Sequence, residues 1–413
     1  MGRSSWRAQS CRTCLARKVK CDKARPTCCR CRSSNRECGG SSSTTPTHGT
    51  HTLLHPSQQL MAEYQSQTQL LAQFLHDYLP PKTRRAVTYP SPLHWAETFF
   101  TLLESGSPIV HASLAALTLT HTANTRHDDA LAQQGRHQYE LAVQQIRALP
   151  ALTQPTDLIR SGMILALYES CTHSPGQGNA WQIHVQAACN LVRQLAAPAL
   201  ALSKQDLRRL RTVDFLRICI DGQIISPPNL ELPAEPATDV FDRLLDILYQ
   251  IMHTLAAVRR KTRLDGLNRD SAELLMRRAV VHEAQLLDWY RGLQSEDGGM
   301  VISRPAAVSR EATKKNALAF SNPSVIPLML LYWLGMVAVY ASTAETLQTL
   351  AQSRQFATST TLPQRLNKAD SLCRHFANRI HQRHAGCAGL GLGTAILAAA
   401  TAAAARQICA SRQ

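Results

Sequence analysis

The sequence CRTCLARKVKCDKARPTCCRCRSSNREC, residues 11–38, decides how the N-terminal part of this 413-residue chain folds. Six of its cysteines follow the spacing C-x2-C-x6-C-x6-C-x2-C-x6-C, and they are Cys11, Cys14, Cys21, Cys28, Cys31 and Cys38. The stretch consists of two similar halves, each a C-x2-C pair followed by a third cysteine, and the halves meet near Pro26. Each half supplies three thiolates.

The number of cysteines bears on the kind of metal site. Zinc in a closed structural site takes four ligands, so three cysteines per half would leave two independent sites open. If Cys11 and Cys28, the first cysteine of each half, both bridge two ions, each ion reaches four sulfurs from only six residues. The count therefore points to a binuclear cluster with two Zn²⁺. Cys29 is extra and is expected to be a free thiol, with exchange for Cys28 as the less favoured arrangement.

Disulfides or a metal-buffering tail are the alternatives for these six cysteines. A disulfide framework requires a secretory route, and residues 1–9 are polar with no apolar signal core. The remaining cysteines occur singly along the chain and are expected to be buried or free thiols in a reducing compartment. These are Cys171, Cys189, Cys219, Cys373, Cys387 and Cys409. Metal binding in the nucleus or cytoplasm is favoured.

Positive charge is concentrated in the same region. The chain has a formal net charge of +16, and residues 1–40 carry eleven Lys and Arg against only Asp22 and Glu37. These forty residues have almost no large apolar side chains, so their folding is expected to depend on metal binding, which supplies on the order of 10–16 kcal/mol. A dense positive charge favours a polyanionic partner, although a solvated basic face would have the same composition.

Residues 11–38, with the run Arg17-Lys18-Val19-Lys20-Cys21-Asp22 and Pro26, resemble the binuclear zinc cluster of fungal transcription regulators. The resemblance implies a nuclear regulator of RNA polymerase II genes that binds double-stranded DNA at CGG-like triplets. It also implies that the first half enters the major groove. There Lys18 would donate to guanine O6 and N7, with Arg17 beside it.

The remaining basic residues of the module are expected to contact DNA phosphates, which position a protein without reading sequence. These are Arg12, Lys20, Lys23, Arg25, Arg30 and Arg32. Leu15 departs from the family pattern, in which arginine commonly follows the second cysteine. One phosphate contact is therefore expected to be lost, or to be made by Arg12 instead.

Three parts are predicted along the chain: the zinc cluster at 1–40, a flexible linker at 41–58 and a large domain at 59–413. The linker is recognised by its composition, since a run of Gly, Ser and Thr extends from Gly39 to Pro46. Helical periodicity recurs throughout the large domain, and no stretch shows the alternation of a strand. Helices are expected near 93–104, 109–124, 128–149, 156–173, 178–196, 204–221, 239–259, 270–294, 327–351, 364–382 and 394–409. The predicted fold class is thus a small zinc cluster followed by an all-α domain.

Apolar residues between Leu60 and Tyr78 predict one further amphipathic helix. In the family that the cluster resembles, a short coiled coil often follows the linker and forms a homodimer. The segment has fewer than three clean heptads and Gln67 at a seam position, so the first helix of the large domain is the favoured interpretation.

The region 90–200 resembles, in the order and pattern of its helices, the regulatory domain that accompanies this zinc cluster. Its effector or coregulator is not identified by the sequence. Tyr168, Glu169, Trp181 and His184 are expected to be core or helix-contact residues, because lone polar groups in helices are usually hydrogen-bonded.

Several other segments have less specific patterns. The apolar segment Leu328 to Tyr340 is expected to be a buried core helix and the Ala-rich C-terminal segment an ordinary helix, with no membrane partner. Gly389-Leu-Gly391-Leu-Gly393 is expected to connect two helices. The basic runs Arg208-Arg209-Leu-Arg211 and Arg259-Arg260-Lys261 are expected to be solvated helix ends.

Motifs of common enzymes are absent from the sequence: it contains no His-Glu-x-x-His, Gly-x-Ser-x-Gly or Gly-x4-Gly-Lys-Ser/Thr. The leading hypothesis is a pathway-specific transcription regulator, such as one that controls a secondary-metabolite gene cluster. Two alternatives are a zinc- or thiol-responsive sensor that uses Cys29, and an α-helical enzyme with an appended metal module.

Overall fold

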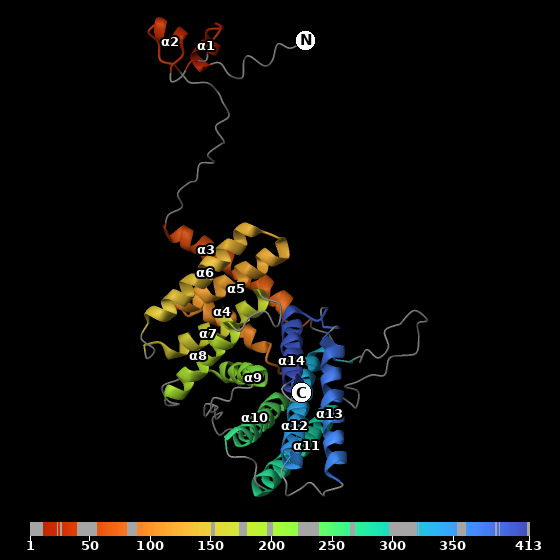
Figure 1. Ribbon diagram of the computed structural model, residues 1–413. Helices are drawn as coiled ribbons and strands as arrows, with labels where there is room; N and C mark the ends of the chain where they lie inside the picture. Colours follow the sequence, from red (N-terminus) through yellow and green to blue (C-terminus); the bar gives the residue numbers. More distant parts are fainter. Residues whose placement is uncertain are drawn as a thin grey trace, which may run out of the picture. The chain divides into compact units, whose positions relative to one another are not determined.

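The computed structural model covers the 413-residue chain as two compact units, Met1–Gln65 and Ser66–Gln413, which are taken separately (Figure 1). The structure describes residues 11–22, 24, 27–38, 56–80, 89–149, 153–172, 180–195, 201–221, 239–264, 269–296, 320, 322–352, 361–384, 386–387 and 389–410. The expected linker lies largely outside these residues.

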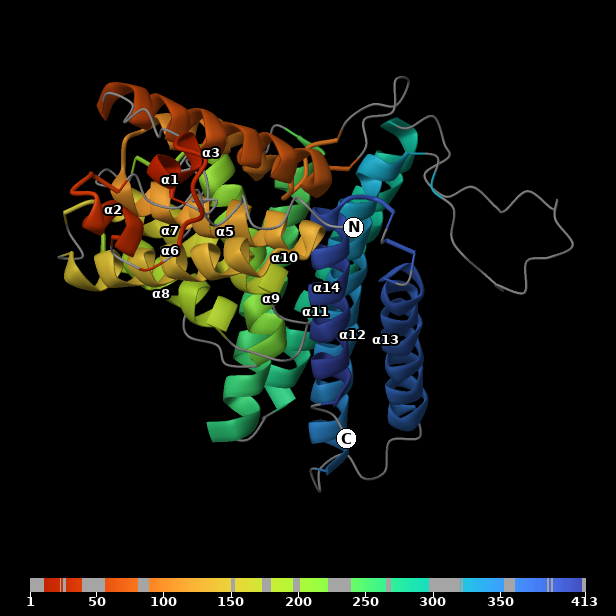
Figure 2. The ribbon, with the colours of Figure 1, turned by 90° about the horizontal axis from the view of Figure 1, so that it is seen from above.

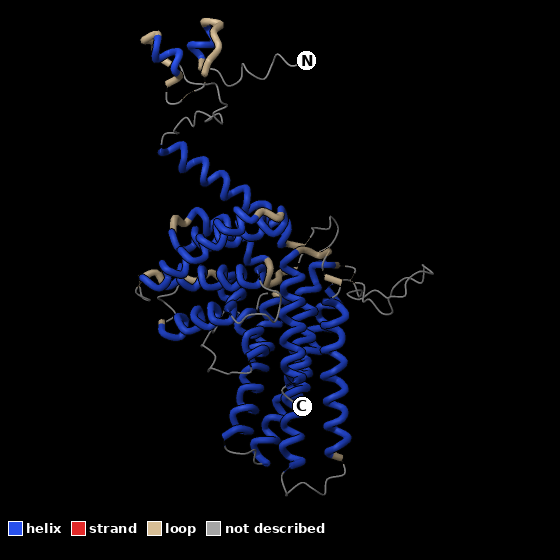
Figure 3. The backbone as a smooth tube through the Cα atoms, turned by 45° about the horizontal axis from the view of Figure 1, so that its top comes forward, coloured by secondary structure: helices blue, strands red, loops and turns tan. Residues whose placement is uncertain are grey.

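Helices form all the regular structure of the described residues, which contain no β-strand (Figure 3). In chain order the elements are α1 (Arg12–Ala16), α2 (Cys29–Ser33), α3 (Pro56–Tyr78), the 3₁₀ helix η2 (His94–Thr98), α4 (Phe99–Glu104), α5 (Pro108–Arg126), α6 (Asp129–Ala148), α7 (Pro155–Thr172), α8 (Ala180–Gln194), α9 (Lys204–Asp221), α10 (Val240–Leu264), α11 (Arg269–Glu296), the 3₁₀ turn η4 (Pro323–Val325), α12 (Ile326–Gln352), α13 (Leu362–His384) and α14 (Leu392–Ala410). The all-α prediction for the large domain is confirmed.

Local sequence signals explain where several helices begin. Asp128 accepts hydrogen bonds from the amides of Ala130 and Leu131, which caps α6. Asp239 caps α10 in the same way, accepting from the amides of Phe241 and Asp242 at 3.0 and 2.9 Å. Pro108 occupies the first turn of α5, where its missing N–H costs no hydrogen bond. Such caps satisfy amides that have no partner within the helix.

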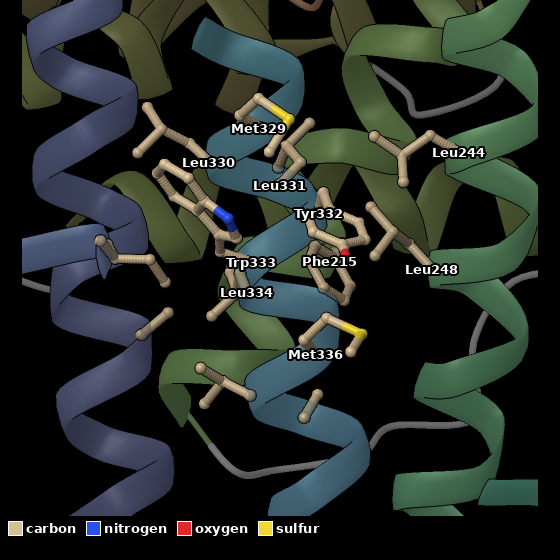
Figure 4. Packing of buried hydrophobic residues seen from close by; sticks show 14 of the residues in the cluster. Phe215, Leu244, Leu248, Met329, Leu330, Leu331, Tyr332, Trp333, Leu334 and Met336 are labelled. Carbon is tan, nitrogen blue, oxygen red and sulfur yellow. The ribbon is translucent and has the colours of Figure 1, made fainter. Parts of the chain in front are cut away.

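The apolar helix α12 forms the centre of one hydrophobic core. It contacts α10, α11, α13 and α14, and Figure 2 shows α12, α13 and α14 side by side. Figure 4 shows its side chains packed beside Phe215 of α9 and facing Leu244 and Leu248 of α10. Two helical stretches, Pro323–Ala351 and Leu392–Ala410, are long and apolar enough to cross a membrane, but 94% of the apolar window of the first is buried within the protein. Its burial agrees with the expected core helix.

A second core lies among α3, α4, α5, α7 and α8. The C-terminal part of α3 contributes Leu71, Phe74 and Tyr78, which are 1%, 0% and 1% exposed. These residues belong to the helical unit, as expected for the first helix of the large domain. Helix α3 begins at Pro56, inside the segment 41–58 that was expected to be linker.

Helix α9 contributes to both cores although it is rich in charge. Leu210 and Val213 pack in the core with α3, and Phe215 packs in the core with α12. Arg208, Arg209 and Arg211 are only 5%, 7% and 4% exposed. The expectation that this basic run is a solvated helix end is therefore wrong. The side chains of Arg259-Arg260-Lys261 lie outside the described residues.

Aspartates in and around α9 form ion pairs with most of its buried arginines. Arg208 pairs with Asp242 at 2.6 Å and also with Asp239. Arg211 pairs with Asp246 at 2.8 Å. Other pairs involving the helix are Arg217 with Asp214 at 2.7 Å, and Asp206 with Arg160 at 2.9 Å. Buried charges are tolerated when a counter-charge and hydrogen bonds replace water.

The glycine-rich run connects α13 to α14, as expected. Gly391 has a φ of +91°, a left-handed conformation that favours glycine. A Cβ atom on Gly393 would lie 2.7 Å from the carbonyl oxygen of Tyr78, so glycine allows α14 to approach the end of α3. Gly391 therefore serves the backbone conformation, and Gly393 serves the close packing of α14 against α3.

The buried pair of Arg217 and Asp214 gives a testable prediction. Replacing Arg217 with methionine leaves Asp214, which is 0% exposed, without this cation. We expect the free energy of unfolding of the helical unit to fall by about 3–5 kcal/mol. Chemical denaturation followed by far-UV circular dichroism measures this change.

The matched control is Arg277→Met, which removes an exposed arginine of α11 that pairs with Glu273, also on α11. Its expected cost is below about 1 kcal/mol. The double variant Asp214→Leu/Arg217→Met is expected to recover much of the loss, because no buried charge of the pair is left alone. Equal losses for Arg217→Met and Arg277→Met would contradict the prediction.

Candidate metal centre and nucleic-acid interface

The two halves of the N-terminal module have the same local structure. Helix α1 follows Cys11, and helix α2 follows Cys28. After each helix one residue adopts a left-handed conformation, Lys18 with φ +56° and Asn35 with φ +44°. The next amide returns to the second cysteine of the half: Val19 donates to the carbonyl of Cys14, and the residue after Asn35 donates to that of Cys31. The repeat in the sequence is thus also a repeat in the backbone.

The six cysteine sulfurs gather into two groups of four. One group contains Cys11, Cys14, Cys21 and Cys28, and the other contains Cys11, Cys28, Cys31 and Cys38. Within each group the sulfurs all lie within 4.8 Å of one another. The two groups share Cys11 and Cys28, the pair that the ligand count assigns as bridging.

Sulfur separations test whether zinc fits. The Sγ atom of Cys11 lies 3.7 Å from that of Cys28 and 3.7 Å from that of Cys31, and the Sγ atoms of Cys14 and Cys28 are also 3.7 Å apart. Zn–S bonds of about 2.3 Å in a tetrahedron place two sulfurs about 3.8 Å apart. The observed spacing therefore suits thiolates that share an ion.

Backbone amides also point at these sulfurs, in matching positions of the two halves. Cys14 donates to the sulfur of Cys11 at 3.3 Å, and Cys31 donates to that of Cys28 at 3.3 Å. N–H donors stabilise a thiolate, but burial outweighs them here and raises the pKa of Cys11 to about 12. A metal cation held by the shared cysteines, Cys11 and Cys28, would favour the thiolate form of the sulfurs around it.

Asp22 holds the two halves together through the backbone. Its carboxylate accepts hydrogen bonds from the amides of Cys29 and Arg30 at 2.9 and 3.3 Å, at the beginning of α2. These bonds hold the pKa of Asp22 well below its usual range. Asp22 lies in the first half and caps the helix of the second, so it restricts the position of one half against the other.

Two further contacts join the halves. The hydroxyl of Thr13 donates to the carbonyl of Glu37 at 2.8 Å, and Arg17 Nη1 donates to the hydroxyl of Ser34 at 3.3 Å. The second of these contacts places the Arg17 guanidinium against the second half. The halves are thus joined by polar contacts as well as by the cysteine cluster.

The structure describes five of the basic residues proposed for DNA binding. Arg17, Lys18, Lys20, Arg30 and Arg32 are all exposed. The side chains of Arg12 and Leu15 lie outside the described residues, as do Lys23 and Arg25. The described basic side chains are exposed while most of the clustered cysteines are buried, so this part of the module offers cations at its surface.

Cys29 lies outside both groups of four sulfurs and is exposed. The Asp22 carboxylate beside it raises the pKa of its thiol. A raised pKa lowers the fraction of reactive thiolate near neutral pH. These properties do not favour the sensor hypothesis, which needs a readily oxidised Cys29.

The fold and site together define a class of protein: a basic, six-cysteine metal-binding module attached to an all-α domain. Residues 9–47 match the model of the fungal Zn(2)-Cys(6) binuclear cluster domain, and residues 69–253 match that of the fungal specific transcription factor domain. No curated protein and no solved structure matches the chain. The chain therefore carries the two domains of a fungal transcription regulator, and DNA is the partner of its zinc cluster domain.

Sequence reasoning missed two structural roles in the module. It assigned no role to Asp22, because a cap that acts on a helix seven residues away leaves no local spacing signal. It also gave no sign that Lys18 has a positive φ, a conformation that Asn35 in the other half adopts more readily. The repeat of 17 residues between Lys18 and Asn35 is the signal that relates the two positions.

The cap leads to a prediction on metal affinity. Asp22→Ala leaves the amides of Cys29 and Arg30 without their acceptor, and metal binding must then order a less stable module. We expect zinc affinity to fall several-fold, measured by competition with a chromophoric chelator. Asp22→Asn keeps an oxygen acceptor and is expected to lose less. Equal affinities in the wild type and Asp22→Ala would argue against a capping role.

Proposed function

We propose that residues 11–38 hold two Zn²⁺ ions, with Cys11 and Cys28 as bridging ligands. The observation that carries this proposal is that the two groups of four sulfurs share these two cysteines. Cys14 and Cys21 complete one set of ligands, and Cys31 and Cys38 complete the other. The ions supply the positive charge that stabilises the buried thiolates and the free energy that folds the module.

We further propose that the zinc-loaded module binds double-stranded DNA in the nucleus at CGG-like sites. Lys18 is assigned to the bases, since a lysine amine donates to the O6 and N7 acceptors of guanine. Its positive φ supports this assignment, because a left-handed backbone is costly for a lysine and such conformations occur frequently at functional sites. Arg17 lies beside it in the sequence and is fixed by Ser34.

Phosphate contacts are assigned to the remaining basic residues, Arg12, Lys20, Lys23, Arg25, Arg30 and Arg32. The exposure of Lys20, Arg30 and Arg32 supports this part of the proposal. Phosphate contacts determine affinity and salt dependence and carry no direct sequence information.

The domain division 1–40, 41–58 and 59–413 belongs to the same proposal. The match over 69–253 lies within its last part, whereas the match over 9–47 and helix α3, which begins at Pro56, both extend into the segment 41–58. We also propose that the helical domain regulates a particular pathway, such as a secondary-metabolite gene cluster. The support for this narrower role is the resemblance of the helical domain. The same proposal includes a homodimer, whose geometry would set the spacing of two DNA half-sites.

Zinc stoichiometry tests the metal centre. Native mass spectrometry of the full chain is expected to show two zinc ions per chain, and Cys28→Ser is expected to lose zinc because it removes a shared ligand. Cys29→Ser is the matched control, since it changes the adjacent thiol, which lies outside both groups. One ion in the wild type, or zinc loss in Cys29→Ser, would contradict the bridging assignment.

Lys18→Gly tests the base contact separately from the fold. Glycine accepts a positive φ, so we expect zinc affinity to be retained. Discrimination between a CGG-containing duplex and one with a changed guanine is expected to fall by about 1–3 kcal/mol. Fluorescence anisotropy with the zinc-loaded chain measures both duplexes.

Two controls separate the roles. Asn35→Gly makes the same backbone change in the other half and is expected to keep discrimination. Lys20→Gln is expected to weaken both duplexes alike and to lower the salt slope by about 1. Identical behaviour of Lys18→Gly and Lys20→Gln would refute the assignment of base contact to Lys18. The DNA-binding proposal itself fails if the wild type shows no zinc-dependent preference over a scrambled duplex.

A further inference from the structure

The helical unit contains a cavity of about 460 Å³ that is lined by α3, α7, α8, α9 and α14, and by His384 at the end of α13. Cavities of roughly 300–1,000 Å³ are typical of sites for small organic ligands. Most residues in the wall formed by α14 are small, such as Gly393, Ala399 and Ala403, and Ile396 and Leu397 are the larger ones. Trp181 and Leu216 add larger apolar surface. The lining therefore suits a mostly apolar molecule.

Arg209, which lines the cavity, differs from the other arginines of α9 in its ion pairing. Of the four arginines of α9, Arg208, Arg211 and Arg217 each pair with an aspartate. Arg209 is equally buried, at 7% exposed, and lines the cavity. Among the described residues no carboxylate forms an ion pair with it, and its Nε atom has no hydrogen-bond partner.

The guanidinium of Arg209 is held in place by an aromatic side chain. Its central carbon lies 5.4 Å from the centroid of the Trp95 ring, a cation–π contact. Such a contact orients the group, but it does not replace the charge-assisted hydrogen bonds that a carboxylate would accept. A buried cation without a counter-charge is energetically costly, so an anion bound beside it gains strongly.

We propose that this cavity is a binding site for a small, mostly apolar organic acid, whose carboxylate pairs with Arg209. The apolar body of the ligand lies against α14 and Trp181. The site belongs to the helical unit alone and does not depend on DNA binding by the zinc cluster.

Glu169 also lines the cavity, and its negative charge would select a ligand of the opposite charge to the one that Arg209 selects. Its carboxylate lies 4.0 Å from Nε2 of His184. If Glu169 selected the ligand, the preferred ligand would be an amine in place of an acid. The charge preference of the cavity therefore distinguishes the two residues.

The position of the site gives binding a structural consequence. Leu93 and Tyr78 of its lining belong to the core with α3, Leu216 and Leu397 belong to the core with α12, and α9 contributes to both cores. A ligand here contacts both cores at once. Because it binds the folded unit in preference to the unfolded chain, it raises the midpoint of thermal unfolding.

The experiment uses the zinc-loaded full chain and three probes of one shape: 2-naphthoic acid, 2-naphthalenemethanol and 2-naphthylmethylamine. Isothermal titration calorimetry is expected to show the acid binding at least about tenfold more tightly than the neutral alcohol, as expected for hydrogen bonds to a charged group. The acid is also expected to raise the midpoint of thermal unfolding.

Arg209→Met is expected to remove the preference for the acid, and Arg209→Lys to retain part of it. Arg277→Met, which removes an exposed arginine on α11, is the matched control and is expected to bind as the wild type does. Circular dichroism establishes that each variant is folded.

Ala403→Leu fills the cavity while keeping Arg209, so it is expected to lose both the acid and the alcohol. It also tests the site if Arg209→Met does not fold. The proposal is overturned if the wild type binds none of the probes, or binds the alcohol or the amine at least as tightly as the acid. It is overturned equally if folded Arg209→Met keeps the preference, or if folded Ala403→Leu binds the acid as the wild type does.

Discussion

The sharing of Cys11 and Cys28 between two groups of sulfurs is the constraint on which the N-terminal module depends. Residues 11–38 have too few apolar side chains for a hydrophobic core, and the residues buried there are the cysteines themselves. Two halves with three thiolates each satisfy two tetrahedral ions only by sharing ligands. In the proposed cluster this requirement brings the halves together, and Asp22 also joins them through the amides of α2.

The helical unit is organised around a different interaction, the pairing of buried charge on α9. A helix with four arginines lies between two apolar cores, and aspartates of its own and of neighbouring helices, mainly α10, neutralise most of its charge. Breaking one pair is costly because the remaining charge stays buried. Arg209 departs from this pattern and lines the cavity, which makes it the place where the unit can take an external anion.

Much of the fold was predictable from local patterns. Each expected helix between residues 93 and 409 is present, with differences of a few residues at the ends. Capping residues such as Asp128 and Asp239 lie next to the helices that they start. The number of ligands that zinc needs also singles out Cys11 and Cys28, the two cysteines that both groups of sulfurs contain. The error on Arg208, Arg209 and Arg211 has a physical cause: a basic run looks alike in sequence whether water or distant aspartates surround it.

The sequence by itself determined the metal-binding module, the all-α class and the positions of the helices. Cysteine spacing, helical periodicity and caps act within a few residues, so each can be recognised without knowing how the chain packs. Tertiary structure alone decided which charges on α9 are paired, that Asp22 caps the opposite half and that small residues of α14 leave space beside Arg209. These features depend on contacts such as that of Arg208 with Asp242, 34 residues away, which helix packing creates and no local pattern records.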